Sequence, residues 1–165
     1  MYRPLNNRSR ERGSTLIEFT VVASGFFMML LAIVAGSNLY FTHNALVEAT
    51  RRGARYAATQ AASNPAGLST ACPLTNAGPS LTAIRNYTIY GNSAGTGSPL
   101  LNGLQPSNIN VEYYNFGVGT GSVSVSITGY TYYFVIPFIN QQITMPAYRT
   151  TTAGESAGAL PGTCN

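Results

Sequence analysis

Residues 12–41 read RGSTLIEFTVVASGFFMMLLAIVAGSNLYF, and this stretch decides the fold. From residue 19 to residue 47 the chain has no Lys, Arg, Asp or Glu, and large apolar side chains dominate residues 19–34. A helix needs roughly 20 apolar residues to cross the hydrocarbon core of a bilayer. Residues 14–41 supply them without a proline, so the sequence predicts a membrane-spanning helix there.

The positive charge of the chain is concentrated ahead of this helix. Residues 1–12 contain four arginines and one glutamate, a net charge of +3 out of the total of +4. Basic residues beside a membrane helix favour the cytoplasmic side, so we expect the C-terminal part on the other side. Beyond residue 12 the only basic cluster is Arg51, Arg52 and Arg55, so we expect no nucleic-acid partner.

The helical pattern continues past the apolar run. Glu48, Arg51, Arg52 and Arg55 have the i, i+3, i+4, i+7 spacing of one polar helix face, and Glu48 is placed to pair with Arg52. Small residues at 45, 49, 53, 57 and 61 form a smooth strip on which other elements can pack. We predict one helix over residues 14–62, roughly 70 Å long, with an amphipathic second half over 42–62. The Ser-Asn-Pro sequence at 63–65 would end it.

The chain changes character after residue 63. Residues 63–80 are rich in Ala, Ser, Pro and Gly, and strand-like runs follow at 87–90, 109–116, 122–128 and 142–150. The run SVSVSIT at 122–128 alternates strictly, which predicts one buried and one solvent-facing side, and GVGTG at 117–121 predicts a hairpin turn before it. The predicted fold is α+β. A small antiparallel sheet from the strand-rich domain at 63–165 packs on the second half of the long helix.

One motif lies at the start of the apolar run. Residues 8–19 read RSRERGSTLIEF, a basic leader that ends in glycine and is followed five residues later by a single glutamate. A carboxylate in a membrane helix is costly, so Glu18 is expected to have a partner. Two simpler explanations remain open: an uncleaved signal anchor, or a signal peptide cut near residues 34–36.

Gly13, then four residues, then Glu18-Phe19 resembles the processing site of type IV prepilins. Residues 12–58, with NALVEATRRGARYAA at 44–58, resemble more specifically the TadE-like minor pilins of tight-adherence (type IVc) pili. Relatives often have a proline a few residues after the Glu-Phe pair, where this chain has Ala23-Ser24. The helix kink expected in those relatives is therefore not predicted here.

The resemblance implies a processing pathway. A prepilin peptidase would cut between Gly13 and Ser14 and remove residues 1–13 as a leader, and Ser14 would be the N-methylation site. Glu18 and Phe19 would take part in assembly. The implied partners are the lipid bilayer, other major and minor pilins and the inner-membrane pilus assembly platform.

The resemblance also implies a location and a role. The chain would sit in the bacterial inner membrane with a single span and a periplasmic C-terminal domain, and then in the pilus at the cell surface, where it supports adhesion. Because about 100 residues follow the helix, a minor pilin or pseudopilin is expected rather than the short main subunit. The alternative is an anchored or exported adhesin domain that is not built into a filament.

Two cysteines, Cys72 and Cys164, lie far apart in the sequence. In an exported domain we expect them to form a disulfide, and two unrelated buried thiols are the alternative. Their spacing does not suggest a metal site, and no cofactor is expected.

No catalytic residue is expected either. The sequence GNSAG at 91–95 fits the G-x-S-x-G pattern of a hydrolase, but that motif needs a strand before it, a helix after it and a nearby histidine. The only histidine is His43, at the predicted membrane edge, where an interfacial role is expected. An aromatic group could form an adhesive surface or pack in the core; it comprises Tyr130, Tyr132, Tyr133, Phe134 and Phe138.

Overall fold

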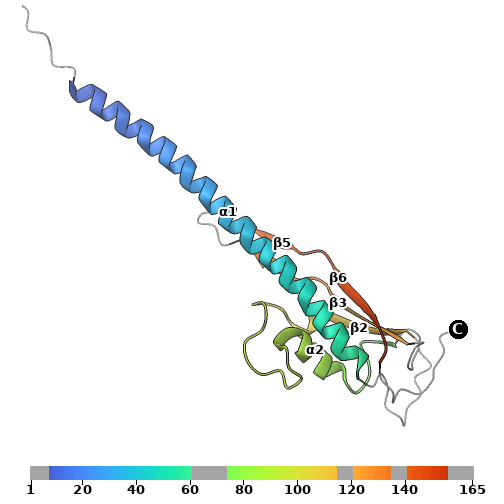
Figure 1. Ribbon diagram of the computed structural model, residues 1–165. Helices are drawn as coiled ribbons and strands as arrows, with labels where there is room; N and C mark the ends of the chain where they lie inside the picture. Colours follow the sequence, from blue (N-terminus) through green and yellow to red (C-terminus); the bar gives the residue numbers. More distant parts are fainter. Residues whose placement is uncertain (1–7, 61–73, 115–120, 135–140, 156–165) are drawn as a thin grey trace, which may run out of the picture.

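The computed structural model describes residues 8–60, 74–114, 121–134 and 141–155. One long helix, α1 (Arg8–Ala58), carries every other described element on its C-terminal half, and its N-terminal half projects alone (Figure 1). Its 51 residues extend for about 76 Å. The α+β fold predicted from the sequence is confirmed. The helix ends four residues earlier than predicted, because Thr59 and Gln60 form a turn with hydrogen bonds to Tyr56 and Ala57.

The N-terminal half of α1, called the bare half below, provides hydrogen-bond acceptors for its own hydroxyl groups. Thr20, Ser24 and Ser37 each donate a side-chain hydrogen bond to a carbonyl three or four residues earlier, at 2.8 Å in every case. Such bonds remove the cost of placing a hydroxyl in an apolar surrounding. The helix also passes through Ala23 and Ser24 without a break, as expected where no proline stands.

A second helix, α2 (Leu81–Tyr90), follows the two-residue strand β1 (Leu74–Thr75) and packs against α1. The predicted strand at 87–90 is therefore wrong. Ile84, Thr88 and Ile89 are buried at helical spacing, and Gly91 ends the helix in the left-handed conformation with its N–H bonded to the Tyr87 carbonyl. The β-favouring composition of this run is overridden by the packing of one helical face.

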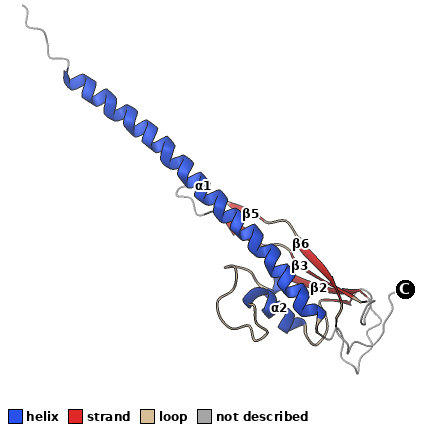
Figure 2. Ribbon diagram, viewed as in Figure 1, coloured by secondary structure: helices blue, strands red, loops and turns tan. Residues whose placement is uncertain are grey.

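The strands, including β1, form two antiparallel sheets (Figure 2). The larger sheet has the order β1-β2-β3-β6, and the smaller pairs β4 with β5. The bounds of these elements, with the short 3₁₀ helix η1 before them, are η1 (Pro106–Asn108), β2 (Ile109–Tyr114), β3 (Ser122–Ile127), β4 (Thr131–Tyr133), β5 (Gln142–Thr144) and β6 (Tyr148–Ala153).

The predicted strands agree with this arrangement in part. β2 and β3 match the runs at 109–116 and 122–128 and pair in antiparallel register, Val111 opposite Val125. The predicted turn lies mostly outside the described residues. The run at 142–150 is not one strand but two, in different sheets, because the segment at 145–147 contains Pro146, which has no N–H for a sheet hydrogen bond.

The core lies between the larger sheet, α2 and the C-terminal half of α1, which is called the docked half below. The predicted strip of small residues is buried at Ala45, Ala49, Gly53 and Ala57. A Cβ atom at Gly53 would overlap the Thr88 hydroxyl of α2 and lie 3.3 Å from a Val125 methyl group of β3. Small residues thus allow α2 and the sheet to approach the α1 backbone closely.

The outer side of the sheet is less exposed than the alternation predicts. Ser124 is only 1% exposed, because Arg149 lies across it and donates from Nε to Ser124 Oγ at 2.6 Å. The same guanidinium donates from Nη2 to Glu112 at 2.6 Å and to the Tyr114 hydroxyl at 2.8 Å. The hydrogen bond with Tyr114, aided by the charge of Glu112, raises the pKa of Arg149 above its ordinary value. A charged side chain therefore covers this part of the polar side.

Candidate functional site

The bare half of α1 exposes large apolar side chains in every direction. Phe26, Phe27, Met28 and Met29 are consecutive and each is more than half exposed, so they point to four sides of the helix. Phe19 is 72% exposed. Among the described residues there is one helix long and apolar enough to cross a membrane, and this segment lies in it. Because burial of each such side chain contributes about 1.5–3 kcal/mol, a covering of lipid or protein is required.

The predicted cleavage and assembly residues lie at the far end of this bare half. Gly13 is exposed, and a Cβ atom there would meet nothing within 4 Å. Ser14 Oγ donates to Glu18 Oε1 at 3.3 Å, one helical turn away. Ser14 and Glu18 therefore share one side of the helix.

The predicted polar face lies at the opposite end of α1. Arg52 Nε lies 3.8 Å from Glu48 Oε1, which confirms the expected pair, although the exposure of both side chains keeps its contribution small. Tyr56 stacks flat on Tyr87 of α2, with ring centroids 4.3 Å apart. These side chains and Arg55 line a shallow groove of about 360 Å³.

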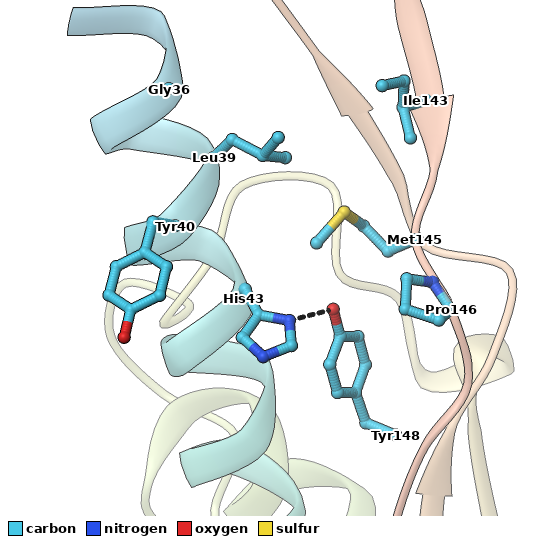
Figure 3. A pocket seen from close by; sticks show the side chains of 8 residues that line it. All are labelled: Gly36, Leu39, Tyr40, His43, Ile143, Met145, Pro146 and Tyr148. Carbon is cyan, nitrogen blue, oxygen red and sulfur yellow. Dashed lines mark hydrogen bonds between the residues drawn. The ribbon is translucent and has the colours of Figure 1, made fainter. Parts of the chain in front are cut away.

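An open cleft of about 510 Å³ lies where α1 passes from its bare half to its docked half. The wall formed by α1 includes Gly36, Tyr40 and His43, and the facing wall is formed by residues 143–148 (Figure 3). His43 Nδ1 lies 2.8 Å from the Tyr148 hydroxyl, and this hydrogen bond bridges the two walls at the end nearer the domain (Figure 3). His43 thus has a partner in β6.

Sequence reasoning missed this cleft. Its two walls are more than 100 positions apart in the chain, and neither wall carries a recognisable binding motif. The only signal was the placement of Tyr40 and His43 just after the apolar run, which is where amphipathic rings gather at membrane interfaces.

The G-x-S-x-G segment is a capped helix end. It follows α2 rather than a strand, so Ser93 lacks the strand-to-helix turn that a nucleophile elbow requires. Asn92 organises the loop by donating to the Thr96 carbonyl at 2.7 Å and accepting from the Thr96 N–H at 3.1 Å. Asn86 also holds the Ser93 carbonyl, at 3.1 Å.

The aromatic group divides between core and surface. Tyr130 is buried and donates to the Asn102 carbonyl at 3.0 Å, and Tyr132 packs against the core and edge-on against Phe134. Tyr133 is 62% exposed. Phe138 lies outside the described residues, as do both predicted disulfide partners, Cys72 and Cys164. Within the described ranges no three His, Cys, Asp or Glu side chains gather in a way that could hold a metal ion.

Comparison with known proteins gives one match. The family model described as "TadE-like protein" matches residues 13–55, from the glycine of the predicted cleavage site to the last arginine of the polar face. No curated protein matches the chain, and no solved structure does. The matched residues cover the bare part of α1 and most of its docked continuation, so this segment is similar to TadE-like proteins.

Proposed function

We propose that this chain is a minor pilin or pseudopilin of a tight-adherence pilus, cut after Gly13 by a prepilin peptidase and then assembled with other pilins. The observation that carries the proposal is the division of α1. One unbroken helix is bare and apolar for its first half and docked against a folded domain for its second. The TadE-like match covers the junction of these two halves.

The bare half suits two environments in succession. A helix that is apolar on all sides is stable in a bilayer or at the centre of a bundle of similar helices. An assembly subunit needs both, because it waits in the membrane and then moves into a filament. The docked half keeps the domain attached to the same helix during this transfer, since α2, β3 and β6 all contact α1.

Glu18 gives the assembly step a specific contact. Its carboxylate would lie in the apolar part of the bilayer, where an unpaired charge costs several kcal/mol. Cleavage after Gly13 creates a positive α-amino group at Ser14, one turn from Glu18. Pairing can occur within one chain or between neighbours. We propose that Glu18 of one subunit pairs with the new N-terminus of the next, which sets their relative position along the helix axis.

The test is the mature N-terminus of the chain expressed with its native membrane machinery. Mass spectrometry of the intact protein should give a mass that begins at Ser14, with or without one methyl group. A chain that begins near residue 36 would instead identify an exported domain, and an uncut chain would identify a plain membrane anchor. Either of these two results contradicts the pilin proposal.

A further inference from the structure

The cleft between α1 and residues 143–148 lies at a defined depth. Gly36 follows Ser14 by 22 residues, which is about 33 Å of helix, and a bilayer's hydrocarbon core is about 30 Å thick. With Ser14 at one face of this core and Glu18 one turn inside it, the Gly36 end of the cleft lies near the opposite face. In the placement that the proposed function gives to α1, this end of the cleft borders the apolar interior of the membrane.

The cleft lining is apolar at the end nearer the bilayer and polar at the end nearer the domain, and a lipid has its tail and headgroup in the same order. The end nearer the bilayer has Gly36 on one wall and Ile143, which is 44% exposed, on the other (Figure 3). The end nearer the domain holds the hydrogen-bonded pair of His43 and Tyr148, and Tyr40 stands beside it, 69% exposed. The Tyr148 hydroxyl is neutral at neutral pH, as for any tyrosine, and is available for a hydrogen bond.

The size of the cleft discriminates between occupants. Its volume of about 510 Å³ lies within the range of small-molecule sites, roughly 300–1,000 Å³. A helix with side chains is about 10–12 Å wide and would need an uninterrupted groove, whereas the His43–Tyr148 hydrogen bond crosses this one from wall to wall. One flexible hydrocarbon chain fits better than a helix of a second copy.

We propose that this cleft holds one acyl chain of a bilayer phospholipid. The tail lies between Gly36 and Ile143, and the ester and headgroup region lies level with Tyr40 and the His43–Tyr148 pair. This inference rests on the proposed membrane insertion of α1. It adds a bound lipid to the joint between the bare and docked halves of the helix.

The test counts the phospholipids that the full chain retains. The chain is inserted into palmitoyl-oleoyl phosphatidylglycerol vesicles, extracted into a mild detergent and weighed by native mass spectrometry. The wild type should keep one phospholipid. Gly36→Phe should lower this retention about tenfold, because its ring excludes about two methylene groups from the cleft. Among the described residues, nothing outside the helix itself lies within 4 Å of a Cβ at Gly36, so the new side chain can start without a clash.

Gly25→Phe is the matched control. Gly25 also lies on the bare helix with nothing within 4 Å of its Cβ position, but it does not line the cleft. Ile143→Phe fills the cleft from the opposite wall and should also reduce retention, so the result does not depend on one variant. Thermal unfolding followed by circular dichroism checks that each variant is folded.

The outcomes separate this inference from the proposed function. Equal retention by Gly36→Phe and Gly25→Phe, or no lipid on the wild type, overturns the lipid site while insertion and cleavage stand. The lipid site is also overturned if Gly36→Phe abolishes cross-linking between copies and leaves lipid retention unchanged, because the cleft would then hold a second copy of the chain. A chain that alkaline carbonate washes out of the membrane overturns both proposals together.

Discussion

The two halves of α1 obey opposite packing rules. Before Gly36 the helix carries large apolar side chains that are mostly exposed, and after Asn44 its buried side chains are mostly small, with Leu46 the large exception. Gly25 and Gly53 show the contrast at single positions. A Cβ at Gly25 would meet nothing, and one at Gly53 would overlap Thr88. Large side chains suit a fluid or a variable neighbour, whereas small ones suit a fixed neighbour at close range.

The largest effect is expected from a substitution at the proposed cleavage site, at the N-terminal end of the bare half. A peptidase that cuts after a small residue cannot accept a bulky side chain in that position, so Gly13→Leu should leave all of the chain as full-length precursor in the membrane. Since nothing among the described residues lies within 4 Å of a Cβ at Gly13, folding should not change. Immunoblots of membrane fractions measure the ratio of precursor to mature protein. Normal shortening by 13 residues would refute the assignment of the site.

The next effect concerns the charge in the bare half. Glu18→Gln keeps the size and hydrogen-bonding capacity of the side chain and removes the charge. Cleavage after Gly13 and the amount in the membrane should be normal, but co-assembly with other pilins should be lost. Without the carboxylate, the neighbour's α-amino charge would be left unpaired in an apolar surrounding, at a cost of about 3–5 kcal/mol. Co-purification with sheared filaments is the measurement. Normal incorporation of Glu18→Gln would show that the glutamate is only a polar edge of the anchor.

A matched pair of substitutions sharpens the comparison directly. Gly53→Leu should destabilise the domain by about 3 kcal/mol or more, because overpacking there displaces Thr88 and crowds Val125. Gly25→Leu should not destabilise it, since the position is open and leucine favours the helix by roughly 0.5–1 kcal/mol. Denaturant unfolding of the full chain in detergent provides both values. Equal effects at the two positions would contradict the division of the helix.

The smallest effect lies in the docked domain and depends on pH. Burial raises the pKa of Tyr113 to about 12 from its ordinary value of 10.0. The folded state therefore holds this proton more tightly than the unfolded state, so the stability it contributes is complete below pH 10 and is lost as the pH rises toward 12. The loss is roughly 2 to 3 kcal/mol once the pH exceeds 12. Unfolding free energies at pH 9 and pH 12 should differ less in Tyr113→Phe than in the wild type, and an identical difference would argue against the burial of this ring.

The outline of the fold was predictable because its signals are local. The apolar run, the strip at 45, 49, 53 and 57 and the alternation at 122–128 each follow from neighbouring residues, and they form the expected helix and strand, although Ser124 is buried on the side expected to face solvent. The helix at 81–90 was not predictable in this way. Its last four residues, Tyr-Thr-Ile-Tyr, favour a strand, and only contact with α1 makes the helix more stable. The coverage of Ser124 by Arg149 and the cleft near His43 also depend on contacts across more than 20 positions.

Because α1 is continuous, the orientation of the domain relative to the membrane depends on how the helix tilts in the bilayer. No break separates the bare half from the docked half, so a tilt of the helix in the bilayer is also a tilt of the whole domain. Ala58 lies 22 residues beyond Gly36, about 33 Å of helix, and at a typical tilt of about 20° its end moves sideways by roughly 11 Å. A thinner bilayer increases the tilt and leans the domain toward the surface, whereas a thicker one raises it. If α1 spans a bilayer as proposed, the thickness of that bilayer therefore sets the angle between the sheet and the membrane surface.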